Sequence, residues 1–231
     1  MPTTETIIMS VGGSLIVPGD IDTHFLSTLK DFITDQTTNH GRRFIMIAGG
    51  GRTARNYQDA AATVTELNPE DIDWMGIHAT RLNGHLLRTV LRDIAHPEMI
   101  TNPDTIQDIP GEPAVVIASG YRPGSSTDLI AVHIAQYVGA TKVINLSNID
   151  YVYTDDPATN PDAQKIEKTN WSEFRELIPE EWNPGMSAPF DPVAAKSAER
   201  SGMEVAIING SRPDALANYL AGEAFIGTMI S

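Results

Sequence analysis

The sequence predicts an α/β fold in which helices cover both faces of a largely parallel sheet. Short runs of β-branched and apolar residues recur along the chain, and longer segments with helical periodicity separate most of them. This alternation is typical of strand-helix-strand units, which place their strands parallel. In addition, four turns rich in glycine or hydroxyl side chains directly follow predicted strands, as expected where parallel strands end at a ligand site.

Five segments are predicted as strands, because each is a short apolar run that ends in turn-forming residues. In chain order they are TIIMSVG (6–12), RFIMIAGGG (43–51), AVVIASG (114–120), KVINLSN (142–148) and EVAIING (204–210). Between the first two, a helix is predicted from Asp22 to Asp35. It is assigned to core packing because apolar side chains recur on one face at helical spacing, at Phe25, Leu26, Leu29, Phe32 and Ile33.

A longer helix is predicted from about Glu70 to Ala95. It contains Gly76 and Gly84, each of which costs ~1 kcal/mol relative to alanine inside a helix, so we expect another element to pass close to them. The segments 153–165 and 178–192 are rich in turn formers and are predicted as loops, which tend to carry function on an α/β scaffold. No internal repeat or linker is evident, so residues 1–231 are expected to form a single domain.

Composition excludes several classes of function. The chain has 231 residues, 41% of them hydrophobic, which is enough for a sizeable core. The absence of cysteine excludes disulfides, thiolate metal sites and thiol nucleophiles, and fits a reducing cytoplasm. The formal net charge of −14 argues against nucleic-acid binding. Neither a signal peptide nor an apolar run of the ~20 residues that a membrane span requires is present, so we expect a soluble cytoplasmic protein with no membrane partner.

The four polar turns are predicted to meet at one edge of the sheet, because the carboxyl ends of parallel strands lie together. They cover Ser10 to Leu15, Ala48 to Arg55, Ser119 to Asp128 and Leu146 to Pro157. One shared ligand site is the simplest interpretation.

The turn Gly49-Gly50-Gly51 is typical of an anion site. Glycine lets backbone N–H groups approach a phosphate, and a helix that begins near Arg52 would direct its positive end there. Arg52 or Arg55 would add charge-assisted hydrogen bonds, although a turn needed only for packing is the alternative. The turn satisfies G-x-G-x-x-A, but the acidic residue expected on the next strand falls in a predicted helix, near Asp71 and Asp73, which argues against a dinucleotide site. No P-loop motif occurs.

Two predicted helix starts supply further candidates. Ser126 or Thr127 is an N-cap by type, and Asp128 opens the helix that follows. Besides capping, a carboxylate there would pair with a metal ion or orient a cation. Asp191 is a second predicted N-cap, followed by Lys196, which is either a solvated lysine or the point charge of a phosphoryl-transfer site. The six histidines show no ligand spacing.

Six motifs resemble those of the amino acid kinase family in order and approximate spacing. They are SVGGSLIVPGDID, IAGGGRTARNY, DWMGIHATRLNGHLL, PGSSTDLIAVHIAQYVGA, LSNIDYVYTDDPATNPDAQKI and APFDPVAAKSAERSG. Within the family, the chain is most similar to the archaeal-type uridylate kinases, and the resemblance covers nearly the whole chain. It implies a three-layer α/β/α sandwich with a central, mostly parallel sheet. The half at about 1–140 would bind the phosphoryl acceptor and the half at about 141–231 would bind ATP.

The resemblance also implies phosphoryl transfer from MgATP to UMP, giving UDP, in pyrimidine nucleotide biosynthesis. The implied cofactors are ATP and Mg²⁺, with Mg²⁺ entering on ATP rather than on a metal site of the protein. Catalytic roles would fall on Asp128, Gly13, Ser14 and Lys196. UMP would contact Gly50, Asp73, Tyr121, Arg122, Pro123, Gly124, Ser125, Ser126 and Thr127. ATP would contact Ser10, Gly12, Gly13, Ser14, Gly51, Arg55, Ser147, Asn148, Tyr153 and Asp156.

Three departures from the family pattern leave alternatives open. Ser10 and Val11 stand where many members carry a lysine, Tyr121 follows Ser119-Gly120 where relatives read Gly-Gly-Thr, and Tyr151 replaces a glycine. One alternative is a kinase for isopentenyl phosphate, a carboxylate or a carbamate. Another is a non-catalytic binding protein on the same fold, resembling the molybdenum storage proteins.

Asp73 favours a nucleotide acceptor, because a carboxylate suits ribose hydroxyls and would be unfavourable beside a prenyl chain. UMP and ATP are therefore the expected small-molecule partners. The resemblance further implies a homo-oligomer, a hexamer built as a trimer of dimers.

Overall fold

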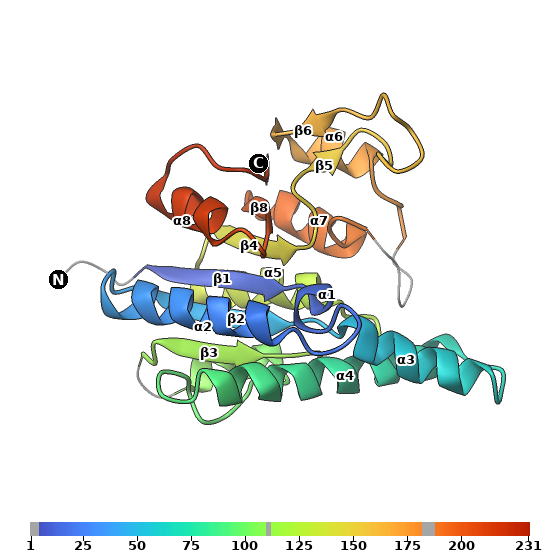
Figure 1. The fold of residues 1–231 in the computed structure, drawn as a ribbon, viewed down its shortest axis with the longest axis horizontal. Helices are drawn as coiled ribbons and strands as arrows, with labels where there is room; N and C mark the ends of the chain where they lie inside the picture. Colours follow the sequence, from blue (N-terminus) through green and yellow to red (C-terminus); the bar gives the residue numbers. More distant parts are fainter. Residues whose placement is uncertain (1–4, 110–111, 182–187) are drawn as a thin grey trace.

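The computed structural model describes residues 5–109, 112–181 and 188–231, and it confirms the predicted α/β class. Seven strands form one sheet in the order β3-β2-β1-β4-β8-β9-β7, and Figure 1 shows the succession from β3 to β8. The strands of the predicted runs are all parallel to one another, whereas β9 runs antiparallel to β8. In sheet order the bounds are β3 Val115–Ala118, β2 Arg43–Ala48, β1 Thr6–Val11, β4 Lys142–Ser147, β8 Glu204–Asn209, β9 Thr228–Ile230 and β7 Lys168–Thr169.

Helices cover both faces of this sheet, which makes the fold a three-layer α/β/α sandwich. Alternate residues of β1 show the division, because Ile8 packs into one buried apolar cluster and Met9 into another. The cluster around Ile8 includes side chains of α5 (Thr127–Val138), α6 (Trp171–Glu176) and α7 (Pro192–Arg200). The cluster around Met9 includes side chains of α1 (Gly13–Ile16), α2 (Thr23–Thr38), α4 (Pro69–Val90) and α8 (Pro213–Ala221).

The two predicted helices form, with shifted ends. Asp22 caps α2 by accepting a hydrogen bond from the Phe25 N–H at 2.9 Å, and the helix continues three residues past the predicted end at Asp35. The predicted apolar face is buried except for Phe32, which is only partly covered. Helix α4 begins after the cap residue Asn68 and ends at Val90, so the prediction that it reaches Ala95 is wrong. After Val90 the chain forms turns, in which backbone N–H groups donate hydrogen bonds to carbonyl groups a few residues earlier.

Only one of the two helix glycines marks a close approach. A Cβ on Gly84 would lie 2.7 Å from the Met99 sulfur and 3.6 Å from the Ala118 carbonyl oxygen, so α4 packs tightly against the end of β3 there. A Cβ on Gly76 would meet only the Gln58 amide nitrogen, at 3.6 Å, which is ordinary contact. The expectation of crowding at Gly76 is therefore wrong, and that glycine instead borders a cavity.

Several short elements were not anticipated from the sequence. A hairpin of β5 (Val152–Tyr153) and β6 (Lys165–Ile166) brackets the predicted loop 153–165, and a 3₁₀ helix covers Pro103–Asp108. The second predicted loop, 178–192, falls partly outside the described residues, at 182–187.

Helix α3 (Gly51–Ala62) and the first turns of α4 extend past the carboxyl end of the sheet, at the right of Figure 1. Helix α3 packs chiefly on α4 and buries none of its own residues fully. Among the described residues, every helix is too short or too polar to span a lipid bilayer.

Candidate functional site at the carboxyl edge of the sheet

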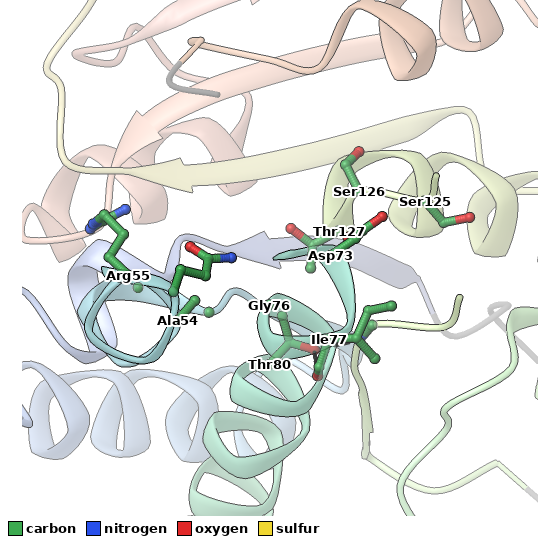
Figure 2. Close-up of a pocket in the computed structure, with 13 residues that line it drawn as sticks. Ala54, Arg55, Asp73, Gly76, Ile77, Thr80, Ser125, Ser126 and Thr127 are labelled. Carbon is green, nitrogen blue, oxygen red and sulfur yellow. Dashed lines mark hydrogen bonds between the residues drawn. The ribbon is translucent and has the colours of Figure 1, made fainter. Parts of the chain in front are cut away.

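A cavity of about 220 Å³ opens between α3, α4 and the start of α5. The close-up in Figure 2 places Arg55 on α3, Asp73 and Thr80 on α4, and Ser126 and Thr127 at the start of α5. The lining consists of Gly50, Gly51, Ala54, Arg55, Gln58, Asp73, Gly76, Ile77, Thr80, Gly120, Ser125, Ser126 and Thr127. Two of the four predicted turns, Ala48 to Arg55 and Ser119 to Asp128, therefore line one cavity, whereas neither Ser10 to Leu15 nor Leu146 to Pro157 contributes to it.

Asp73 is held in place by the loop that it faces. Its side chain is buried, and its Oδ2 accepts a hydrogen bond from the Gly124 N–H at 2.6 Å. Burial raises the pKa of Asp73, and the Gly124 hydrogen bond opposes part of that rise. One carboxylate oxygen is thus used to order the loop, which leaves Oδ1 as an acceptor for a ligand hydroxyl.

Two further residues of α4 bind the same loop. The Thr80 hydroxyl accepts from the Gly120 N–H at 2.7 Å and donates to the Ile77 carbonyl at 2.7 Å. The Arg81 guanidinium donates to the carbonyl oxygens of Gly120, at 3.2 Å, and Tyr121, at 3.0 Å. The loop therefore has a conformation set by α4, although Tyr121 itself and Arg122, Pro123 and Gly124 do not line the cavity.

Asp128 is the centre of a buried polar cluster. Its Oδ1 accepts hydrogen bonds from the Ser10 hydroxyl, at 3.0 Å, and from the Asn145 side-chain amide, at 3.4 Å. Its Oδ2 accepts from the Asp191 N–H at 3.2 Å. The strands β1 and β4 and the first residues of α5 and α7 are joined at this one carboxylate, as their ends meet at the same edge of the sheet.

Burial has a large effect on this carboxylate. It raises the pKa of Asp128 to about 6, with a further contribution from the negative charge of Asp191, while the hydrogen bonds from Ser10 and the Asp191 N–H oppose the rise. Burial also raises the pKa of Asp191, whose Oδ1 caps α7 by accepting from the Ala194 N–H at 2.6 Å. Two neighbouring acids with raised pKa values form a region where an added cation is strongly stabilised.

The glycine turns pack against each other through bare backbone. A Cβ on Gly13 would lie 2.0 Å from the Gly51 nitrogen, and one on Gly49 would lie 2.4 Å from the Gly13 nitrogen. Gly51 also has φ +61°, in the left-handed region that favours glycine. Any side chain at Gly13 or Gly51 would force the two turns apart, so glycine is required there for their contact.

A second, larger cavity of about 640 Å³ lies beyond the end of β4. Its lining includes the four residues expected on the adenine nucleotide side, Ser147, Asn148, Tyr153 and Asp156, together with Tyr151. The Asp156 Oδ1 accepts from the Ala158 N–H at 2.9 Å, so this carboxylate also shapes its own loop. The described residues at the far side of the cavity are Glu176, Leu177, Ala188 and Pro189.

The Asp128 cluster lies between the two cavities. Thr127, next to Asp128, lines the first cavity, and Asn145, which bonds Asp128, also donates to the Pro189 carbonyl at 3.3 Å on the lining of the second.

Some predicted residues lie elsewhere. Arg52 pairs with Asp59 at 3.9 Å, so of the two candidate arginines only Arg55 lines the cavity. The Lys196 ammonium donates to the Glu180 carbonyl at 3.0 Å rather than to a group of the Asp128 cluster. Gly51 and Arg55, expected on the ATP side, border the first cavity together with Asp73.

Sequence reasoning did not single out four residues of α4 and β4 that hold the site, which are Thr80, Arg81, Asn83 and Asn145. Asn83 is 3% exposed, and Asn145 is 6% exposed between the buried Ile144 and Leu146 of β4. A polar residue inside an apolar run was the available signal, since buried amides require hydrogen-bond partners. Among the described residues, no group of three or more acidic, histidine or cysteine side chains gathers to hold a metal ion.

A mostly parallel sheet with helices on both faces, whose glycine turns and buried carboxylates gather at one edge beside two cavities, defines an α/β protein with a three-layer sandwich fold. The chain matches the amino acid kinase family over residues 5–209 and belongs to that family.

Curated relatives agree with this membership. The chain is 33% identical over 211 residues to a uridylate kinase of Pyrococcus abyssi, covering 91% of this chain and 92% of that protein. It is 35% identical over 191 residues to a uridylate kinase of Hyperthermus butylicus, covering 83% and 84%. The solved structure of the uridylate kinase from Archaeoglobus fulgidus superposes with a TM-score of 0.81 at 27% identity, covering 99% of this chain and all of that one.

Proposed function

We propose that this chain transfers the terminal phosphoryl group of MgATP to UMP, giving UDP. The observation that carries the proposal is the first cavity, whose lining brings together Asp73 of α4, Arg55 of α3 and Gly50 and Gly51 of the glycine turn. A carboxylate for ribose hydroxyls and backbone amides with an arginine for phosphate are the groups that a nucleoside monophosphate requires. The uridylate kinases similar to this chain support UMP as that acceptor.

Positioning and charge compensation account for the reaction. Phosphoryl transfer needs little covalent help from the protein, because the barrier falls when the reactants are aligned and the charge on the transferred group is met. UMP would occupy the first cavity and ATP the second, with Ser147 and Asn148 on its lining. The amides of Gly50 and Gly51 and the guanidinium of Arg55 would bind phosphate oxygens.

Asp128 would orient the cationic groups of the reaction from its place between the cavities. Mg²⁺, when bound with ATP, supplies charge that offsets the negative phosphates. Asp128 and Asp191 suit a neighbouring cation because their buried carboxylates lack a positively charged partner among their described hydrogen bonds. A role for Lys196 requires its side chain to leave the Glu180 carbonyl.

Other acceptors on the same fold are less favoured. Isopentenyl phosphate would bring an apolar chain against the buried Asp73, and a small carboxylate or carbamate would leave this carboxylate without a hydroxyl partner. The buried Asp128 cluster between two cavities favours a transferase over a storage protein, since a protein that only binds has no need of it.

We further propose that the protein acts in the cytoplasm and that it associates with copies of itself. Helices α3 and α4 expose large apolar side chains, with Tyr57 66% and Leu82 63% exposed, and Thr53, Tyr57, Met75, His78, Ala79 and Leu82 line one surface groove. We propose that this face contributes to the homo-oligomer, a hexamer built as a trimer of dimers.

A coupled ADP-release assay tests the proposed reaction. UMP is expected to be the best acceptor in a panel of nucleoside monophosphates, isopentenyl phosphate and small acids. Turnover of isopentenyl phosphate in preference to UMP, or no turnover of any nucleotide, would exclude the proposal.

A further inference from the structure

We propose that Asn83 is a positioning residue that aims the backbone amides of the glycine turn, Gly49–Gly51, at the phosphoryl group. This inference rests on the proposed function, because it assigns the turn a phosphate ligand. Asn83 lies on α4, is 3% exposed and does not line either cavity. It would therefore act only through the turn.

The side-chain amide of Asn83 binds two consecutive carbonyl groups of the turn. Its Nδ2 donates to the Gly49 carbonyl oxygen at 2.8 Å and to the Gly50 carbonyl oxygen at 3.0 Å. Because both neighbours are acceptors, only the NH₂ group of the amide can face them. No aspartate, serine or aliphatic residue of similar size supplies two donors in this arrangement.

Peptide geometry converts this contact into an orientation of the N–H groups. The C=O and N–H of a trans peptide point in opposite directions, and the described chain contains no cis peptide. Holding the Gly49 carbonyl toward α4 therefore turns the Gly50 N–H away from α4, and holding the Gly50 carbonyl does the same for the Gly51 N–H. Neither N–H has a hydrogen-bond partner among the described residues, so both are available to an anion.

The turn is fixed from its other side by α1, where Gly13 lies in backbone contact with Gly51. Asn83 and Gly13 thus hold the turn between two helices. Gly84 permits the approach of α4 that brings Asn83 within reach, because a side chain there would collide with Met99.

One turn of α4 serves both sides of the first cavity. Thr80 and Arg81 bind the 120–121 backbone of the acceptor loop, and Asn83 binds the glycine turn. Removing the Asn83 amide should therefore disturb phosphate contacts while leaving the Asp73 side of the site intact. This separation distinguishes a positioning role from a general loss of structure.

Kinetics of Asn83→Leu test the proposal, with Gln36→Leu as the matched control. Gln36 is also a buried amide, 6% exposed, but it lies on α2 and binds Arg42. We expect Asn83→Leu to lower kcat by about 30-fold or more while the KM for UMP changes less than about 3-fold, since misaimed amide donors mainly weaken transition-state binding. Gln36→Leu should leave both constants near their wild-type values even if it lowers the melting temperature.

A second readout does not depend on activity. In protein labelled with ¹⁵N-glycine, inorganic phosphate should shift the Gly50 and Gly51 amide signals of the wild type and of Gln36→Leu, and these shifts should be lost in Asn83→Leu. If Asn83→Leu does not fold, Asn83→Ser, which keeps one donor, should show the same losses to a smaller degree. A folded Asn83 variant with kcat within about 2-fold of wild type and unchanged phosphate shifts would overturn the proposal. A wild type inactive on UMP would exclude the kinase proposal, whereas the phosphate shifts would still test Asn83.

Discussion

Asp128 combines a buried carboxylate with a position close to two cavities. The sequence placed it at the start of a helix, where a carboxylate is ordinary. Its three hydrogen bonds reach side chains and backbone from β1, β4 and α7, which are far apart along the chain. A residue with partners from that many elements is more than a cap of its own helix.

The first prediction concerns the role of the Asp128 charge in catalysis. Asp128→Asn keeps the size of the side chain and removes the negative charge that orients cationic groups, so kcat should fall about 100-fold, a barrier increase of ~3 kcal/mol. UMP binding should persist, because the acceptor cavity retains Asp73 and Arg55. Steady-state kinetics at fixed Mg²⁺ and a UMP dissociation constant measure both, with thermal melting as the control for folding. A folded variant that keeps more than about a third of wild-type kcat would reduce Asp128 to a structural role.

The second prediction concerns stability as a function of pH. The folded pKa of Asp128, about 6, lies above its ordinary value of 3.8. The folded state therefore holds this proton more tightly, and the stability that it contributes is present below about pH 4 and lost as the pH rises through 6. Between pH 5 and 8 the wild type should lose about 1–2 kcal/mol that Asp128→Asn does not lose.

Urea unfolding of both proteins at pH 5 and pH 8 measures this difference. Asp20→Asn, which alters an exposed carboxylate, serves as the control and should follow the wild type. If the free energy of unfolding changes equally with pH in wild type and Asp128→Asn, the pKa of Asp128 is not raised by burial in the folded state.

Individual residues of the site were predictable to different degrees. Ser126 caps α5 by accepting from the Leu129 N–H at 3.1 Å, and Asp191 caps α7, as local sequence rules indicated. The link between Asp128 and Asp191 spans 63 positions and depends on the sheet order, so no local pattern contains it. Asn83 escaped notice for the same reason, since its partners lie more than 30 positions away.

At the scale of elements, α3 separates two arginines that the sequence could not distinguish. Arg52 and Arg55 both follow the glycine turn, and residues three apart lie on neighbouring parts of one helix face, so spacing alone does not separate them. Arg52 pairs with Asp59, and Arg55 lines the cavity (Figure 2).

The third prediction follows from this difference. Arg55→Ala should lower kcat/KM for UMP about 10-fold, the value of one charge-assisted contact at a partly exposed site. Arg52→Ala, on the same helix and equally charged, should remain within about 2-fold of wild type. Steady-state kinetics of the two variants make the comparison, and equal losses would show that net charge rather than position controls phosphate binding.

Long elements were predicted well and short ones poorly. The five strands of the parallel sheet lie inside apolar runs long enough to read, whereas β5, β6 and β7 have two residues each and exist only through their pairing. The prediction extended α4 too far because Leu91 and Ile94 continue its apolar spacing. The backbone nevertheless leaves the helix at that point and forms turns. Periodicity reports which side chains are buried, and it does not separate a helix from the turn that follows it.

At the scale of the whole molecule, the net charge of −14 and the exposed apolar face of α3 and α4 act in opposite directions. Like charge favours separate molecules, and apolar area favours association. The extension of α3 and α4 beyond the sheet makes this face accessible to a second copy (Figure 1). The same two helices carry Arg55 and Asp73 into the cavity, so contact between copies would steady the acceptor site.

The fourth prediction tests this consequence by placing charge on the apolar face. Leu82→Glu puts a carboxylate at a side chain that is 63% exposed on α4, where burial against a second copy would be costly, so the variant should sediment as a smaller species than the wild type. Ile21→Glu makes the same change at a side chain that is 54% exposed outside these helices and should leave the mass unchanged. If α3 and α4 depend on the contact, the KM for UMP should rise in Leu82→Glu alone, because Asp73 lies on the same helix. Sedimentation velocity combined with kinetics at matched concentrations measures both effects. An unchanged mass for Leu82→Glu would place the subunit contact on another face, and a reduced mass with an unchanged KM would show that the acceptor site is complete within one subunit.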